Sequence, residues 1–268
     1  MFRGSLTVVG TGIRAGVQLT LEARSAIERA ERVLFLVAEP TAAGAIRRLN
    51  ATAEPLDELY EPGADRRAVY DAMVERILAP VRAGRSVCAA FYGHPGIFGT
   101  PAHGAVRQAR LEGFEAEMLP GVSALDCLFA DLGLDPGSGG CHCYEATSFV
   151  MRRPPVDTGA ILILWQPIAV GRRDVVTEAD LADVTLLVAR LGELYPAEQE
   201  VICYEASPYP VGKASVTRMR LSKLAGKAIA PLATLVICPP DQAAGAPAQA
   251  HSSSDRAPAA PTTLPLAE

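Results

Sequence analysis

The chain has 268 residues, of which 49% are hydrophobic and 21% charged, and its formal net charge is -5. This length is enough for one large or two modest domains with buried cores. The acidic balance and the lack of a basic stripe argue against a nucleic-acid partner, and we expect none.

The chain also contains no run approaching about 18 apolar residues, the length that a membrane span requires. Its first residues, MFRGSLTVVG, lack the long apolar stretch and the small-residue cleavage site of a secretory signal. We therefore expect a cytoplasmic protein that does not bind membranes. The six cysteines are scattered, which is typical of a protein with reduced thiols.

Strand and helix patterns alternate through the first 118 residues. Short apolar runs predict strands over residues 5–9, 32–37, 87–91 and 115–118. Apolar spacings of three and four predict helices over residues 19–31, 41–49, 66–83 and 103–112. An acidic loop is expected over 56–62, and Thr20 is placed to cap the first helix. This alternation predicts an α/β domain, residues 1–118, with a mostly parallel sheet.

A second α/β domain is predicted over residues 119–240. A helix with a Ser123 cap follows Pro120 and runs toward Pro136, and a later helix is expected over 181–194. Buried strands are predicted over residues 161–165, 201–204 and 234–238. Residues 241–268 are rich in Ala, Pro, Ser and Thr, which predicts a disordered tail.

The segment FYGHPGIFGTP, residues 91–101, is the strongest candidate for a small-molecule site. It follows a predicted buried strand, and open α/β sheets bind ligands at the carboxyl ends of their strands. Gly93 and Gly96 would let the backbone approach a ligand closely, while Pro95 and Pro101 would stiffen the loop. The alternative is a connecting loop with a surface histidine.

Two weaker motifs point to other ligands. The turn at Gly10 and Gly12 starts like a dinucleotide fingerprint, but Ala15 stands in the third glycine slot. The acidic residue expected about 20 residues later is also missing, because Glu39 lies further along. The sequence Cys141-His142-Cys143 has no second ligand pair, so we expect no metal.

A tyrosine–arginine pair marks the start of the third predicted helix. Arg66 and Tyr70 are four residues apart and share one helical face. An arginine beside a phenol lowers the pKa of that phenol, and the pair could act as a general base or stabilise an anion. The alternative is a solvated arginine and a tyrosine that only packs.

Several phrases together resemble the tetrapyrrole methylase superfamily across residues 4–240. They are GSLTVVGTGI, FYGHPGIF, MLPGVSALDCLFADLGLDP and PLATLVICPP. The phrases YGHPG, LPGVSA-x-DCLFADL and CHCYEATSF are most similar to the borosin peptide backbone α-N-methyltransferases. The resemblance implies two α/β domains with S-adenosylmethionine (SAM) in the cleft between them, and a homodimer.

The resemblance also implies individual roles. Nine residues would line the SAM pocket: Tyr92, His94, Ile97, Phe98, Ser123, Ala124, Gln166, Ala206 and Thr234. Three residues would be catalytic: Tyr60, Arg66 and Tyr70. The loop EPGAD between Tyr60 and Arg66 is shorter than in the fungal members and lacks their extra tyrosine.

The substrate implied is a precursor peptide. Fungal borosin proteins carry their own substrate after an additional helical domain, for which the residues after Pro240 leave no room. These residues also lack a Val/Ile/Leu-rich core. We therefore expect a split-type enzyme that methylates a separate, ribosomally made peptide. The alternatives are a methylase of tetrapyrrole or corrin precursors and a non-catalytic SAM-binding partner.

Overall fold

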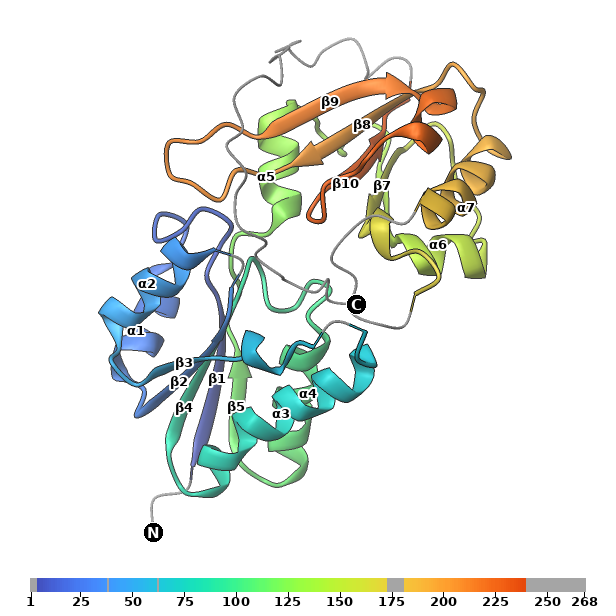
Figure 1. The fold of residues 1–268 in the computed structure, drawn as a ribbon. Helices are drawn as coiled ribbons and strands as arrows, with labels where there is room; N and C mark the ends of the chain where they lie inside the picture. The colour runs from blue at the N-terminus through green and yellow to red at the C-terminus, as the bar shows by residue number, and fades with distance from the viewer. Residues whose placement is uncertain (1–3, 38, 62, 173–180, 240–268) are drawn as a thin grey trace.

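The computed structural model describes residues 4–37, 39–61, 63–172 and 181–239. These residues form two α/β units, each built around one five-stranded sheet (Figure 1). The α/β fold class predicted from the sequence is confirmed. The predicted tail over 241–268 lies outside the described residues.

The first domain has a fully parallel sheet with the strand order β3-β2-β4-β1-β5. Its strands are β1 (Ser5–Gly10), β2 (Arg32–Leu36), β3 (Ala53–Pro55), β4 (Ser86–Phe91) and β5 (Glu115–Met118). Phe91 is in register with both Gly10 and Leu36, so three strands end at one level. The loops that follow them therefore meet at the same edge of the sheet.

Helices cover both faces of this sheet (Figure 1). They are α1 (Leu21–Arg29), α2 (Pro40–Leu49), α3 (Arg66–Arg82) and α4 (Thr100–Leu111). Val33 and Phe35 pack in the core under α1 and α2, whereas Leu34 packs in the opposite core with α3 and α4. Successive side chains of a strand point to opposite faces, so a sheet covered on both sides requires a continuous apolar run.

The predicted elements of this domain are present, with shifted ends. Thr20 caps α1 by accepting a hydrogen bond from the backbone of Ala23, as expected. The helix predicted from residue 103 begins at Thr100, because Pro101 fits its first turn. The strand β3 and the short 3-10 helix η1 (Asp57–Leu59) were not predicted, since three residues carry no usable periodicity.

The second domain has a mixed sheet with the order β6-β7-β10-β8-β9. Its strands are β6 (Cys141–Glu145), β7 (Ile161–Trp165), β8 (Glu200–Glu205), β9 (Ser215–Arg220) and β10 (Thr234–Ile237). Strand β10 runs antiparallel to both β7 and β8. The sheet is covered by α5 (Ala124–Leu132), α6 (Ala146–Arg152) and α7 (Leu181–Gly192), together with the 3-10 helices η2 (Pro167–Ala169) and η3 (Leu221–Gly226).

Strands β6 and β9, the two edges of the second sheet, were missed by the sequence prediction. The residues Cys141-His142-Cys143 belong to β6. Among the described residues, no three His, Cys, Asp or Glu side chains gather as a metal site would require. No helix in the described part of the chain is long and apolar enough to cross a membrane.

Direct contacts between the domains include two hydrogen bonds and an ion pair. The Ala15 amide donates to the carbonyl of Pro208 at 3.0 Å, and Arg14 lies 3.7 Å from Asp131 of α5. Elsewhere, the guanidinium of Arg66 donates to the carbonyl of Arg172 at 2.6 Å.

Candidate functional site

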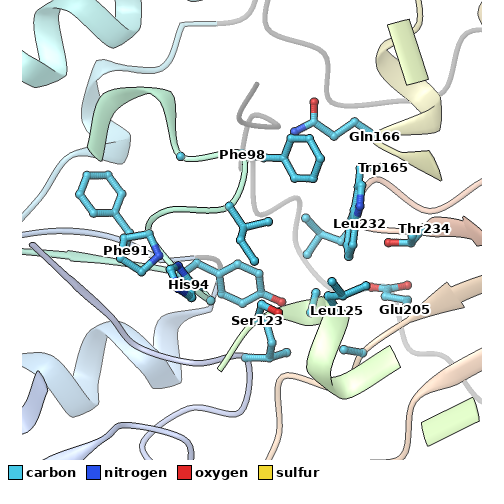
Figure 2. Close-up of a pocket in the computed structure, with 18 of the residues that line it drawn as sticks. Phe91, His94, Phe98, Ser123, Leu125, Trp165, Gln166, Glu205, Leu232 and Thr234 are labelled. Carbon is cyan, nitrogen blue, oxygen red and sulfur yellow. The ribbon is translucent and has the colours of Figure 1, made fainter. Parts of the chain in front are cut away.

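A pocket lies between the two domains (Figure 2). The first domain contributes Leu36 at the end of β2 and the loop that follows β4. The second contributes the start of α5 and the residues at the ends of β7 and β8 and the start of β10. The strands of the first domain thus open their carboxyl ends onto this space, which is where open parallel sheets bind ligands.

The glycine loop after β4 is held by close backbone packing. Gly93 has a φ of +68°, and its amide donates to the carbonyl of Gly12 at 3.1 Å. A Cβ on Gly10 would lie 2.3 Å from the carbonyl oxygen of Gly93. The glycines of these two loops are therefore required by the approach of one loop to the other.

Two histidines, His94 of the loop and His103 of α4, fix the backbone of Gly96. The Gly96 amide donates to Nδ1 of His94 at 2.9 Å, and its carbonyl lies 3.0 Å from Nε2 of His103. In a neutral His94 ring, Nδ1 then acts as an acceptor and the proton is on Nε2. The loop is thus preorganised, and the alternative of a plain connector with a surface histidine does not fit a half-buried His94 in the pocket wall.

Strained backbone faces the pocket from both domains. Phe98 and Gln166 have φ angles of 51° and 56°, and they are two of the three non-glycine residues with positive φ in the described chain. Such conformations cost about 1–3 kcal/mol and concentrate at functional sites. The ring of Phe98 packs on Trp165 with a centroid distance of 5.7 Å, which joins the two walls.

Gln166 adds an unsatisfied polar atom to this wall. Its side chain is 9% exposed, and its Oε1 is buried without a hydrogen-bond partner. A buried carbonyl oxygen left unpaired costs about 1–3 kcal/mol. Because Gln166 lines the pocket, a rotation of its side chain would present this oxygen to a hydrogen-bond donor on a ligand.

The start of α5 supplies backbone donors. Ser123 and Asp126 form a capping box: the Ser123 hydroxyl accepts from the Asp126 amide, and the Asp126 carboxylate accepts from the Ser123 amide. Ala124 and Leu125 follow and line the pocket. The first amides of a helix have no partner within it and carry partial positive charge, so this end favours a negatively charged ligand group.

All nine residues that the resemblance placed at a cofactor line this one pocket: Tyr92, His94, Ile97, Phe98, Ser123, Ala124, Gln166, Ala206 and Thr234. Whether they bind a cofactor stays a prediction. Outside the glycine loop, the sequence interpretation missed eight lining residues, namely Ile13, Leu36, Leu125, Trp165, Tyr204, Glu205, Leu232 and Ala233. Two of these, Trp165 and Glu205, directly precede predicted residues at strand ends, and that adjacency was the available signal.

Tyr60, Arg66 and Tyr70, which we call the tyrosine–arginine cluster, do not line the pocket. Both tyrosines pack in or against the core that also contains Leu36 and Phe91 of the pocket wall. Arg66 is only 5% exposed, so the alternative interpretation of a solvated arginine is wrong.

The electrostatics of the cluster favour a protonated Tyr60. Burial raises the pKa of Tyr60 well above its usual value, the neighbouring Tyr70 raises it further, and the Arg66 charge lowers it by less. The Tyr60 hydroxyl is buried and interacts with the side chain of Tyr70. It is therefore a phenol that keeps its proton and can donate it in a hydrogen bond.

Comparison with known proteins assigns the class. Residues 5–225 match the family of tetrapyrrole (corrin/porphyrin) methylases, and the chain belongs to this family. Members of the family use SAM. The structure resembles uroporphyrin-III C-methyltransferase from Thermus thermophilus, with a TM-score of 0.63 and 24% identity, covering 88% of this chain and 93% of that one. It also resembles diphthine synthase, with a TM-score of 0.57 and 15% identity over 87% and 89% of the chains.

Among curated proteins, the relatives are fungal methyltransferases joined to peptide precursors. The dendrothelin A precursor of Dendrothele bispora is 44% identical over 77% of this chain and 50% of its own length. The omphalotin A precursor of Omphalotus olearius is 41% identical over 88% of this chain and 58% of its own length. A type I borosin precursor from Serendipita vermifera is 43% identical over 78% and 51%. The chain thus spans about half the length of these relatives.

Proposed function

We propose that this protein is a SAM-dependent methyltransferase that N-methylates backbone amides of a separate precursor peptide. One observation carries the proposal: residues of the pocket wall and the tyrosines of the tyrosine–arginine cluster belong to the same hydrophobic core, in a chain similar to borosin precursors. A cofactor pocket alone fits any methylase of the family. The phenols and the guanidinium of the cluster can supply a hydrogen-bond donor, a positive charge and a proton acceptor, which methylation of an amide nitrogen requires.

The pocket residues would hold SAM, which supplies an electrophilic methyl group. The α5 amides suit a carboxylate, Gln166 Oε1 suits an amine or hydroxyl donor, and the Phe98–Trp165 pair provides apolar contact. Gly96 and His94 keep the loop fixed around the ligand. Most of the rate gain would then come from positioning and preorganised electrostatics.

The tyrosine–arginine cluster would activate the peptide. An amide nitrogen is a poor nucleophile because its lone pair is delocalised into the carbonyl. Tyr60 would donate a hydrogen bond to the amide oxygen, and the buried Arg66 charge would stabilise the negative charge that develops there. Tyr70 would help to remove the amide proton, the role that its pairing with Arg66 predicts.

Two further parts of the proposal concern partners. The substrate is proposed to be a second polypeptide, from the resemblance to split-type members of the family. The enzyme is proposed to be a homodimer, from its resemblance to the family. Light scattering that gives the monomer mass of 28.2 kDa at micromolar concentration would contradict the dimer.

The test is co-expression of the full chain with the short peptide encoded beside it, followed by tandem mass spectrometry of both polypeptides. We expect methyl groups on backbone nitrogens of the peptide. Methyl groups on residues 241–268 of the chain would refute the trans arrangement. Methylation of a corrin or porphyrin precursor in a parallel assay, with no peptide product, would support the alternative tetrapyrrole function.

A further inference from the structure

The segment that follows β7, residues 166–172, connects the pocket with the tyrosine–arginine cluster, and we call it the strap. Its first residue, Gln166, lines the pocket beside Trp165 (Figure 2). The carbonyl of its last residue, Arg172, accepts the 2.6 Å hydrogen bond from the guanidinium of Arg66. The strap therefore joins the wall of the proposed cofactor site to a proposed catalytic side chain of the other domain.

Thr147 fixes the middle of the strap. It lies in the first turn of α6, within the phrase CHCYEATSF, to which the proposed function assigns no role. Its hydroxyl donates to the carbonyl of Ala169 at 3.1 Å and accepts from the amide of Gly171 at 3.2 Å. The hydroxyl thus serves once as a donor and once as an acceptor, and both bonds go to the strap.

The position of Thr147 is itself set by the start of α6. The buried carboxylate of Glu145 accepts hydrogen bonds from the amides of Thr147 at 2.8 Å and Ser148 at 2.7 Å. These bonds satisfy first-turn amides that have no partner within the helix. Thr147 is also β-branched, so few χ1 rotamers are open to it. Its hydroxyl therefore offers the strap a fixed point of attachment.

The strap transmits this position to Arg66. The carbonyl of Ala169, which Thr147 holds, also accepts a hydrogen bond from the amide of Arg172 at 3.1 Å. Residues 167–170 are buried, so the strap is packed into the second domain up to this turn. Because Arg172 is fixed through Ala169, the carbonyl that receives the Arg66 guanidinium has a defined place.

We propose that Thr147 is a positioning residue, which acts on the methylation step through Arg66. The inference rests on the proposed function, in which the buried guanidinium stabilises the negative charge that develops on the amide oxygen. Such stabilisation is effective only when the charge is already in place before the reaction. Without the Thr147 hydroxyl, the exposed Gly171 would lose its amide partner. The Arg172 carbonyl would then shift, and Arg66 with it.

The test compares Thr147→Val, which keeps the shape of the side chain and removes the hydroxyl, with Thr147→Ser, which keeps the hydroxyl. Single-turnover methylation of the partner peptide at saturating SAM measures the rate. We expect Thr147→Val to lower this rate about tenfold and Thr147→Ser to stay within about twofold of the wild type. Calorimetry should show SAM affinity within about twofold of wild type in both variants, because Gln166 is held by β7 and by its own bond to the Ala169 amide.

Thr52→Val is the matched control. Thr52 is also half-buried, and its hydroxyl donates to the side chain of Asn50 at 2.7 Å. It directly precedes β3, whose first residue pairs with the start of β2, whereas the pocket lies at the end of β2. Thr52→Val should keep the wild-type rate, and thermal unfolding of both valine variants compares their stabilities. An equal loss of rate in the two variants would assign the effect to weakened folding and overturn the inference.

A double-mutant cycle shows whether Thr147 acts through Arg66. In an Arg66→Ala background the guanidinium is gone, so Thr147→Val should change the remaining rate by less than about twofold. The same tenfold loss in both backgrounds, or a wild-type rate in Thr147→Val alone, would overturn the inference while the proposed function stands. A wild-type protein that methylates no peptide would instead refute the proposed function, and the inference with it.

Discussion

The pocket takes its lining from both domains, whereas the tyrosine–arginine cluster belongs to the first domain alone. The pocket has strained backbone at Phe98 and Gln166 and an unpaired buried oxygen. The cluster is packed into an apolar core, and Arg66 links it to the second domain by a hydrogen bond to the Arg172 carbonyl. The pocket therefore has groups that a ligand could satisfy, whereas the cluster holds the Arg66 guanidinium between two tyrosines.

Because of this difference, we expect that mutations can change cofactor binding and the methylation rate separately. A change in the pocket should alter cofactor affinity, and a change in the cluster should alter the rate at saturating cofactor. If both regions instead affected both quantities equally, the distinction drawn from burial and strain would fail.

The largest effect is expected in the cluster. Tyr70→Phe removes a hydroxyl and keeps the ring, while Arg66→Ala removes the buried charge. Each should lower the methylation rate about a hundredfold or more, the usual scale of acid–base participation, and leave SAM affinity nearly unchanged. The double variant should lose less than the product of the single effects, because the residues act as one unit.

Single-turnover methylation of the partner peptide measures this effect, with calorimetry for SAM. Arg66 also binds the Arg172 carbonyl, so Arg66→Lys serves as a second variant that retains a charge and a donor. A wild-type rate in Tyr70→Phe would refute the catalytic assignment of that tyrosine.

The next prediction concerns Gln166, whose replacement should raise the stability of the free protein and lower its affinity for SAM. Gln166→Met replaces the buried amide, whose Oε1 has no partner, by an apolar side chain of similar size. The free protein should gain about 1 kcal/mol of unfolding free energy, because an unsatisfied group is removed. SAM affinity should fall about tenfold, because a hydrogen bond to the ligand is lost.

Gln199→Met provides the contrasting control. The Gln199 amide donates to the Cys238 carbonyl at 3.2 Å and does not line the pocket. This variant should lose stability and keep its SAM affinity. Denaturant unfolding and calorimetry give both quantities. A Gln166→Met protein that binds SAM like the wild type would show that Oε1 receives no ligand donor.

A smaller effect compares two helix caps. Ser123 caps α5 at the pocket, and Thr20 caps α1 outside it. Ser123→Ala and Thr20→Ala should each cost about 1 kcal/mol of unfolding free energy, the usual value of such a cap. Only Ser123→Ala should also weaken SAM, since α5 loses its fixed start at the pocket wall. Equal SAM affinities in the two variants would argue against α5 as a binding element.

The sequence predicted the first domain better than the second for physical reasons. Continuous apolar strands such as β2 and β4 are covered on both faces and have a strong pattern. Edge strands β6 and β9 alternate between exposed and half-buried residues and carry polar side chains, so composition does not distinguish them from loops. Residues Cys141 to Cys143 resembled a ligand motif for the same reason.

The pocket could be predicted because its residues stand in recognisable phrases at strand ends. The lining by Trp165 and Glu205 was not predicted, because the resemblance carried over only the residue that follows each of them. The bond from Arg66 to Arg172 was also hidden, since it joins residues 106 positions apart in two domains. Arg66 is buried because of that contact between the domains, and the helical spacing of Arg66 and Tyr70 does not predict this burial.

The smallest effect concerns Tyr60, whose ionisation should add no pH dependence to the methylation rate or to the stability of the protein near neutral pH. A tyrosine phenol ordinarily has a pKa of about 10, and burial raises the pKa of Tyr60 further in the folded protein. A raised folded-state pKa means that Tyr60 stays protonated, and its hydrogen-bond donation is present, throughout the range below pH 10. Its stabilising contribution is then lost only as the pH rises above the ordinary value, where the unfolded chain releases the proton first.

The ratio of wild-type to Tyr60→Phe methylation rates should therefore remain constant from about pH 6.5 to pH 9, whatever other groups do to the two profiles. The difference between their unfolding free energies should likewise be constant over this range and change only above about pH 10, where the wild type alone loses stability. Rates at saturating SAM and denaturant unfolding at matched ionic strength measure the two differences. A rate ratio that falls tenfold between pH 7 and pH 9 would mean that the Tyr60 phenol ionises in the working range. In that case Arg66 outweighs burial at this phenol, and the proton acceptor of the cluster is Tyr60 rather than Tyr70.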